Sequence, residues 1–165
     1  MSIQDVRKLN FPNNFFDGYW SLGVIEHFWE GYHEIIKEAG RVIRPGGYLF
    51  LTLPYMSLLR KLKAKIGLYK KFQREKTNAD QFYQFILDKN KTIKDVEQHK
   101  FRFILKYPYA ATKGIKDEIS LLRPLLQKIY DSRNIIAKGI KFLNSILFSK
   151  IARYSILLIF QKNEE

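Results

Sequence analysis

The 165-residue sequence contains no cysteine. This absence excludes a disulfide framework and a cysteine-based zinc site, and it fits a reducing compartment such as the cytoplasm. The first ten residues contain no apolar segment of the kind found in a secretory signal. No uncharged apolar stretch reaches the ~18 residues that a membrane-spanning helix needs. We therefore expect a cytoplasmic protein whose chain does not cross a membrane.

Acidic residues are scarce, with 16 Asp and Glu against 29 Lys and Arg, which gives a net charge of +13. The imbalance is uneven: residues 1–59 carry 5 basic and 6 acidic side chains, and residues 60–165 carry 24 and 10. The basic part indicates an anionic partner, which could be nucleic acid, a membrane surface or an acidic substrate. A charge that serves only solubility is the alternative. The length and the apolar content of 46% favour a single domain.

Residues 15–54 have the pattern of a βαβ unit. A strand is expected over 18–22, a helix up to Arg44, and a second strand over 48–53. Pro45-Gly46-Gly47 should end the helix, because proline cannot continue the hydrogen-bond ladder. The apolar run after it suits a strand covered on both faces. The predicted buried face of the helix comprises Tyr32, Ile35, Ile36, Ala39, Val42 and Ile43.

The segments FPNNFFDGYWSLGVIEHF and EAGRVIRPGGYLFLTLP together resemble the second half of a class I S-adenosylmethionine-dependent methyltransferase. The resemblance implies an α/β fold, with a partial Rossmann-like sheet made of the family's strands four, five, seven and six. Candidates for the last two are residues 101–107, which precede Pro108, and residues 153–161. A helix is expected over 92–99.

The same resemblance implies S-adenosylmethionine as the cofactor and assigns residues to it. The Asp5 carboxylate would accept from the adenine amino group, although Asp5 also suits a surface turn. Gly23 would let the backbone turn closely beneath the ligand. His27, next to Glu26, is a weak candidate for a general base, since similar proteins use this pair mainly to shape the pocket floor. The expected cofactor-binding residues are Asp5, Val6, Ser21, Leu22 and Gly23, and no metal site is expected.

A glycine-rich G-x-G-x-G loop occurs nowhere in the sequence, and the family's strands one to three have no candidates. We therefore expect one truncated methyltransferase domain over residues 1–165, with an incomplete cofactor site and doubtful activity on its own. Strand four would then be an apolar edge with unpaired backbone groups. A mis-started reading frame or pairing with a separate polypeptide would each account for this.

Two further segments do not belong to the plain family fold. Residues 56–80 begin with a basic amphipathic helix, interrupted at Gly67, that is typical of a lid over an active site or of contact with a membrane. Aromatic residues Phe82, Tyr83 and Phe85 follow and are expected to line the substrate side or to pack under the lid. Residues 114–150 are expected to be a helical insertion divided near Pro124.

Two functions from different classes follow. The first is a methyltransferase that acts on a small-molecule acceptor, lipid-like or anionic. The second is a non-catalytic basic module that binds a membrane surface or nucleic acid through residues 56–76 and 133–153. Nucleic acid is a less favoured partner that the sequence does not exclude.

Overall fold

The computed structural model describes residues 3–69, 82–148 and 151–164. The chain divides into two compact units. The sheet unit comprises residues 1–54, 78–107 and 157–165, and the helical unit comprises residues 55–77 and 108–156. The predicted lid segment lies almost entirely in the helical unit, together with the predicted insertion. Its role as a lid stays a prediction, and its part after Tyr69 lies outside the described residues.

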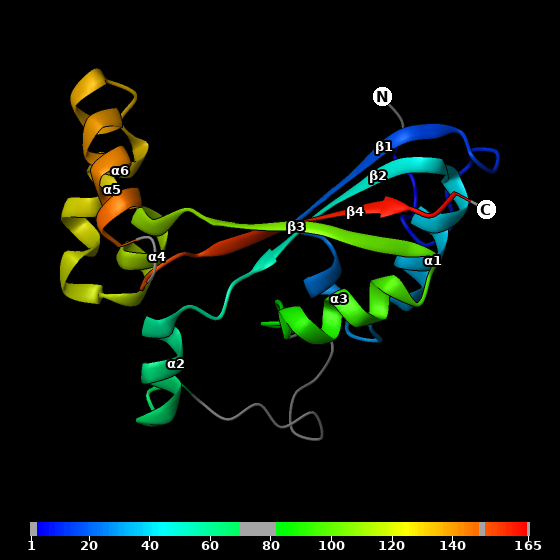
Figure 1. The fold of residues 1–165 in the computed structure, drawn as a ribbon. Coiled ribbons are helices and arrows are strands. Elements are labelled where there is room, and N and C mark those ends of the chain that lie inside the picture. Colours follow the sequence, from blue (N-terminus) through cyan, green and yellow to red (C-terminus); the bar gives the residue numbers. More distant parts are fainter. Residues whose placement is uncertain (1–2, 70–81, 149–150, 165) are drawn as a thin grey trace. The chain divides into compact units, whose positions relative to one another are not determined.

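The described residues form a four-stranded sheet in the order β1-β2-β4-β3 (Figure 1). Its strands are β1 (Phe16–Leu22), β2 (Ile43–Pro54), β3 (Phe101–Tyr109) and β4 (Ser155–Lys162). In family terms this is the order four, five, seven, six, so the predicted partial Rossmann-like sheet is confirmed. β1 is an edge strand of this sheet, and it pairs in parallel with β2.

Two helices of the sheet unit are joined by a buried hydrogen bond. They are α1 (His33–Val42) and α3 (Lys89–Glu97). The Tyr32 hydroxyl, at the start of α1, donates to the Asp95 carboxylate at 2.6 Å. Burial, and then this bond, raises the pKa of Tyr32 to about 12. The helix predicted over 92–99 therefore exists but begins three residues earlier.

The predicted apolar face of α1 is confirmed, because all six residues assigned to it are buried. Apolar strand residues, including Leu51 and Leu158, have no exposed surface either, and α1 contacts β2. Burying a side chain of this size contributes about 2 kcal/mol. This interface fixes α1 against β2 and so sets the position of the loops at the ends of β1 and β2.

The Pro45-Gly46-Gly47 segment lies inside β2 as an irregularity in its pairing with β1. Phe16 pairs with Ile43, but Gly18 pairs with Tyr48, so the extra residues bulge from the ladder. A side chain at Gly47 would place its Cβ 2.8 Å from the Asp17 carbonyl oxygen, so only glycine fits there. The helix ends at Val42, before the proline, and the regular ladder resumes at the residue where the strand was predicted to begin.

The strand over residues 48–53 was predicted to be covered on both faces, and the structure corrects this at Tyr48. Leu49, Leu51 and Leu53 are buried, whereas Tyr48, on the other face, is 40% exposed. Phe50 on that face is half-buried and stacks on Trp20 of β1 at a centroid distance of 4.1 Å. Trp20 itself is 61% exposed, so this face of β1 is open to solvent at Trp20.

The helical unit is built from short helices. They are α2 (Leu58–Lys65), α4 (Ala111–Glu118), the 3-10 turn η4 (Ser120–Leu122), α5 (Arg123–Asp131) and α6 (Ile135–Leu147). Pro124 lies in the first turn of α5, where its missing N–H costs nothing, so it divides the region as predicted. Gly67 follows α2 with φ of +76°, which agrees with the predicted interruption.

Pro108, expected to close β3, lies one residue before the strand's end.

A buried ion cluster holds α2 to α4 inside the helical unit. The Glu118 carboxylate accepts from Arg60 Nε at 2.7 Å and from Lys63 Nζ at 2.9 Å, and the Tyr69 hydroxyl also donates to it. Burial alone would raise the pKa of Glu118, but these hydrogen bonds outweigh burial and leave it below its usual range. Removing one partner of a buried pair of this kind typically costs 3–5 kcal/mol.

Candidate cofactor site

The carboxyl ends of β1 and β2 lie at the same edge of the sheet, because these strands are parallel. In open α/β sheets, ligands bind outside the carboxyl ends of such strands. Gly23 directly follows β1 with φ of +67°, a backbone conformation that other residues adopt at a cost. Its N–H donates to Thr52 Oγ1 of β2 at 2.9 Å, which fixes the turn. The chain therefore leaves β1 sharply and without a side chain at the turn.

Two buried oxygens at this end of β1 lack a hydrogen-bond partner within the described part of the chain. They are Ser21 Oγ and Glu26 Oε2, on side chains of residues that are 4% and 3% exposed. Burial raises the pKa of the Glu26 carboxyl, against smaller lowering effects of a backbone hydrogen bond and of His27. Buried polar groups are nearly always paired, so this pair marks a place where a ligand or water completes the structure. From the sequence, Glu26 was named only beside His27, and its burial was not anticipated.

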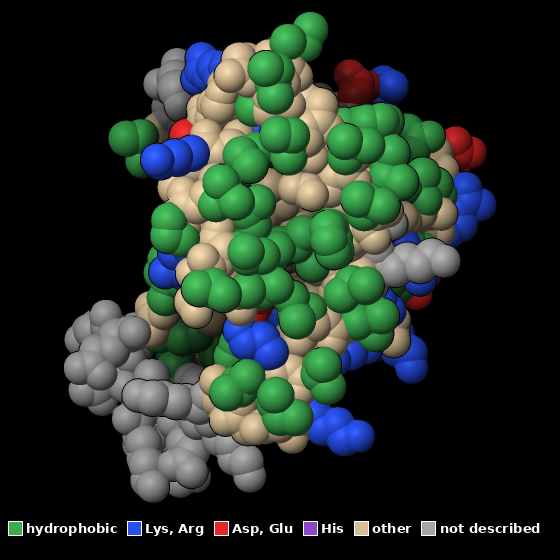
Figure 2. All heavy atoms as spheres, turned by 90° about the vertical axis from the view of Figure 1, so that its left-hand side faces the viewer, with side chains coloured by type: hydrophobic (Ala, Val, Ile, Leu, Met, Phe, Trp, Pro, Cys, Tyr) green, Lys and Arg blue, Asp and Glu red, His purple; other side chains and the backbone are tan. Residues whose placement is uncertain are grey.

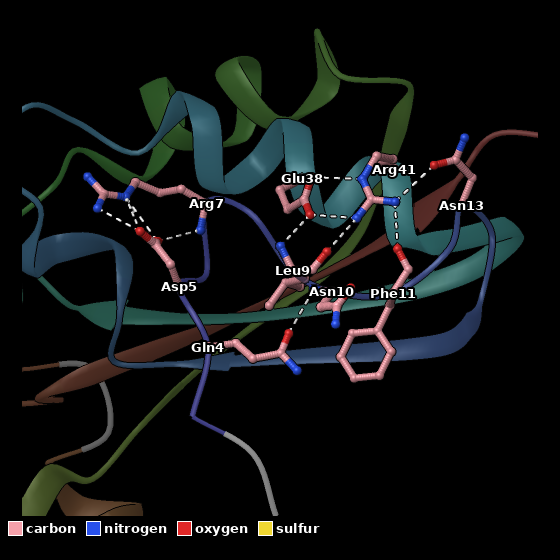
Figure 3. A network of polar contacts seen from close by, with 9 residues as sticks. All are labelled: Gln4, Asp5, Arg7, Leu9, Asn10, Phe11, Asn13, Glu38 and Arg41. Carbon is pink, nitrogen blue, oxygen red and sulfur yellow. Dashed lines mark hydrogen bonds and ion pairs between the residues drawn. The ribbon is translucent and has the colours of Figure 1, made fainter.

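Asp5 forms a tight turn with Arg7 in the loop that precedes β1 (Figure 3). Its carboxylate accepts from the Arg7 amide at 2.9 Å and from the Arg7 guanidinium at 2.7 Å. These hydrogen bonds lower the pKa of Asp5 to about 2, so it is ionised at neutral pH. The turn-forming role was the alternative interpretation of this residue. The guanidinium also lies 5.6 Å from the Phe28 ring centroid, which brings this loop to the segment after β1.

Arg41 on α1 holds the same loop from its other side (Figure 3). Its guanidinium donates to the carbonyl oxygens of Phe11 and Leu9 at 2.7 and 3.0 Å. Glu38, its ion-pair partner at 2.7 Å, accepts from the Leu9 amide at 2.6 Å. No role in this loop was predicted for Arg41 from the sequence.

Aromatic side chains gather beside the 3-10 turn η1 (Ile25–His27), which follows β1. His27 Nδ1 lies 2.5 Å from the Tyr83 carbonyl oxygen, and the two rings meet edge to face. Trp29 contacts Phe82 and Phe85 at centroid distances of 5.1 and 6.1 Å. The predicted aromatic segment 82–85 therefore packs against η1 and the residues after it. Whether it lines a substrate pocket stays a prediction.

The predicted site residues divide into two groups that the Arg7–Phe28 contact connects. Asp5 and the half-buried Val6 belong to the loop before β1, and Ser21, Leu22 and Gly23 end the strand. Their binding of a cofactor stays a prediction. No cluster of metal-ligating side chains occurs over 3–69, 82–148 and 151–164. A hollow of about 420 Å³ lined by Arg102 and Gln161 lies elsewhere, since Gln161 bonds to Gly46 at the amino end of β2.

Residues 1–51 match the family model described as a methyltransferase domain. This part of the chain is therefore similar to a methyltransferase domain. The matched part contains β1, α1 and most of β2, together with every residue predicted to contact the cofactor. No curated protein matches the sequence significantly.

Solved structures of low sequence identity share the predicted fold of this chain. A methyltransferase from Methanosarcina mazei described as S-adenosylmethionine-dependent gives a TM-score of 0.59 at 16% identity, covering 99% of this chain and 67% of that one. One from Archaeoglobus fulgidus gives 0.57 at 12% identity, with 96% and 66% covered. The cyclase SpnF gives 0.57 at 15% identity, and this chain spans 57% of its length.

Proposed function

We propose that the chain functions in S-adenosylmethionine-dependent methyl transfer and that the carboxyl end of β1 holds the adenosine portion of the cofactor. The observation that carries this proposal is the pair of buried, unpartnered oxygens on Ser21 and Glu26 beside the left-handed Gly23. The match of residues 1–51 to the methyltransferase domain supports this proposal, because the matched part includes Ser21, Gly23 and Glu26.

The residues around the site suit this ligand chemically. Asp5 is ionised at neutral pH and can accept a hydrogen bond from an adenine amino group, and the neighbouring Val6 amide can donate to a ring nitrogen. The absence of a side chain at Gly23 leaves room for a ribose above the strand end. The cofactor itself would supply an activated methyl group on its sulfonium. The protein's task is then to position an acceptor and to exclude water.

His27 is the residue we propose for any proton that the acceptor must lose. A carbonyl oxygen only accepts hydrogen bonds, so the Tyr83 carbonyl requires the proton of a neutral imidazole to be on Nδ1. That tautomer leaves Nε2 free to accept a proton. The acceptor is proposed to be a small molecule, lipid-like or anionic, because the chain's excess charge is positive.

Calorimetric titration of the full chain with S-adenosylhomocysteine tests this proposal. We expect one site with micromolar affinity, which Gly23→Ala weakens at least tenfold. The fold is also that of a cyclase, SpnF, so methyl transfer is a separate question from cofactor binding. Absence of heat and of any thermal shift up to millimolar ligand would contradict the proposed binding by this chain.

A further inference from the structure

The whole excess of positive charge belongs to the helical unit. Residues 55–77 and 108–156 contain 17 Lys and Arg against 4 Asp and Glu, a net charge of +13. The sheet unit, which contains the candidate cofactor site, has 12 of each and a net charge of zero. A charge confined to one unit is not needed for solubility of the whole chain, and it indicates that this unit meets an anion.

Helix α6 presents its apolar side chains outward. At ~100° per residue, Ile135, Phe142 and Ile146 form one row along the helix, and Ile136, Leu143 and Leu147 form the adjacent row. Ile135, Phe142 and Leu147 are 84%, 65% and 68% exposed. The opposite side holds Ala137, which is the buried residue of the helix, with Ile140 and Asn144 half-buried beside it.

Polar contacts, more than apolar burial, hold α6 in place. The Asn134 side chain caps it by accepting from the Ala137 amide at 2.7 Å. Lys141 Nζ donates to the carbonyl oxygens of Tyr130 and Ser132, both at 2.8 Å, and so fixes α6 to the end of α5. The exposed rows are therefore not required for the helix to fold. They lower the solubility of the protein without stabilising the helical unit, which is typical of an interaction surface.

Exposed apolar side chains also occur on the other helices of the unit. Leu58, Leu62 and Ile66 recur every four residues along α2 and its C-cap, and each is more than half exposed. Leu121 and Leu125 are exposed at η4 and α5. Figure 2 looks toward the side on which these helices lie in Figure 1 and shows hydrophobic side chains across that face, with Lys and Arg between and around them. We call these residues of α2, η4, α5 and α6 the apolar face.

We propose that the apolar face of the helical unit docks on the surface of an anionic phospholipid bilayer, with its Ile, Leu and Phe side chains in the acyl boundary and its Lys and Arg side chains at the lipid phosphates. An exposed apolar face flanked by basic residues is the pattern of interfacial helices. No helix in the described ranges is long and apolar enough to cross a bilayer, so the contact is with its surface.

Charge and side-chain type favour lipid over the other occupants. Contact with a second copy of the face would bring two units of net charge +13 together. These units repel each other, and the apolar contact would have to outweigh this repulsion. Single-stranded nucleic acid is bound through stacking on aromatic rings, whereas the exposed rows of α6 contain five aliphatic residues and Phe142. Aliphatic side chains gain free energy in hydrocarbon and do not stack on bases.

The test is sedimentation of the full chain with vesicles of phosphatidylcholine alone and of phosphatidylcholine mixed with phosphatidylglycerol, between ~0.05 and ~0.5 M salt. We expect binding to the mixed vesicles only, weakened by salt but not abolished. Ile135→Asp, Phe142→Asp and Leu147→Asp should each weaken it by about tenfold, since each removes about 1.5 kcal/mol of apolar transfer. The matched control Ile3→Asp makes the same change at a fully exposed residue of the sheet unit and should bind as the original chain does.

Circular dichroism of each variant confirms that the fold is retained, which is expected because the replaced side chains are exposed. The proposal is overturned if neither vesicle binds the chain. It is also overturned if the three aspartate variants bind as the control does, which would indicate charge attraction alone. Binding of a fluorescent oligonucleotide that the vesicles do not displace would assign the face to nucleic acid, and concentration-dependent dimers lost in the variants would assign it to a second copy.

Discussion

Arg41 and Glu38, one turn apart on α1, form an ion pair at 2.7 Å and together bind both the carbonyl oxygen and the amide of Leu9. A single pair on one helix thus satisfies the backbone of the loop that leads from Asp5 to β1 (Figure 3). Hydrogen bonds from Arg41 also keep the pKa of Glu38 below its usual range. The loop that carries the predicted adenine contacts is therefore positioned by α1 as well as by its own Asp5–Arg7 turn.

Replacing Arg41 with lysine should loosen this loop. Lysine keeps the charge but cannot reach Phe11, Asn13 and Leu9 from one planar group, so about 2 kcal/mol of loop stability should be lost. Hydrogen exchange at the Leu9 amide measures the effect. Arg44→Lys is the matched control, since Arg44 pairs with Asp17 in solvent, and unchanged protection in both variants would contradict the positioning role.

Gly23→Ala should impair cofactor binding more than it impairs folding. The added methyl group would lie 3.6 Å from Glu26 Oε1, an ordinary contact, so the cost to folding is about 1 kcal/mol from the left-handed backbone alone. Gly67→Ala is the control, because its φ of +76° imposes a similar cost and nothing lies within 4 Å of it. We expect a similar drop in melting temperature in both variants, and lost affinity for S-adenosylhomocysteine only at Gly23. Equal affinity in the two variants would argue against a ligand at this turn.

Glu26→Gln and Glu38→Gln should shift stability in opposite directions at pH 7. Because burial raises the folded-state pKa of Glu26 above the unfolded value of 4.5, its ionisation costs stability as the pH rises through that folded-state pKa. Because hydrogen bonding lowers the pKa of Glu38, its contribution is present above 4.5 and is lost as the pH falls below that value. Urea midpoints at pH 4 and pH 7 should show Glu26→Gln as stabilising and Glu38→Gln as destabilising at pH 7. A destabilised Glu26→Gln would mean that this carboxylate has a partner.

The buried cluster around Glu118 should dominate the stability of the helical unit. Glu118→Gln leaves Arg60 buried with less compensation and should cost about 3 kcal/mol at pH 7. In the original chain this contribution should fade as the pH falls below about 4.5, since the folded-state pKa of Glu118 is depressed. Glu34→Gln is the control, because its 3.7 Å pair with Lys37 is exposed and is worth less than about 1 kcal/mol. Equal urea midpoints for Glu118→Gln and Glu34→Gln would contradict the role of the cluster.

The sheet and the α1 face could be predicted from sequence because their signal is local. A helical period from Tyr32 to Ile43 and an apolar run from Tyr48 to Leu53 each determine an element without long-range information. The strand order followed from the family resemblance. The exposed faces of Tyr48 and Trp20 could not be predicted from the same pattern, because a run of apolar residues does not report which neighbours cover it.

The site was predicted less completely, since its contacts connect residues distant in sequence. The Arg41–Leu9 and His27–Tyr83 contacts span 32 and 56 residues, and neither pair has a spacing rule. The unpartnered oxygens of Ser21 and Glu26 depend on burial, which sequence reports only on average. The sequence predicted a helical insertion over residues 114–150, but a periodic pattern does not tell whether an apolar helix face turns toward a core or toward solvent.

The most direct measurement of the central claim is hydrogen exchange of the full chain with and without S-adenosylhomocysteine. The account predicts added protection at the amides of Val6, Leu22 and Gly23, with the helices of the apolar face unchanged. Protection confined to residues 58–66 or 135–147, or no added protection at saturating ligand, would contradict a cofactor site at the carboxyl end of β1.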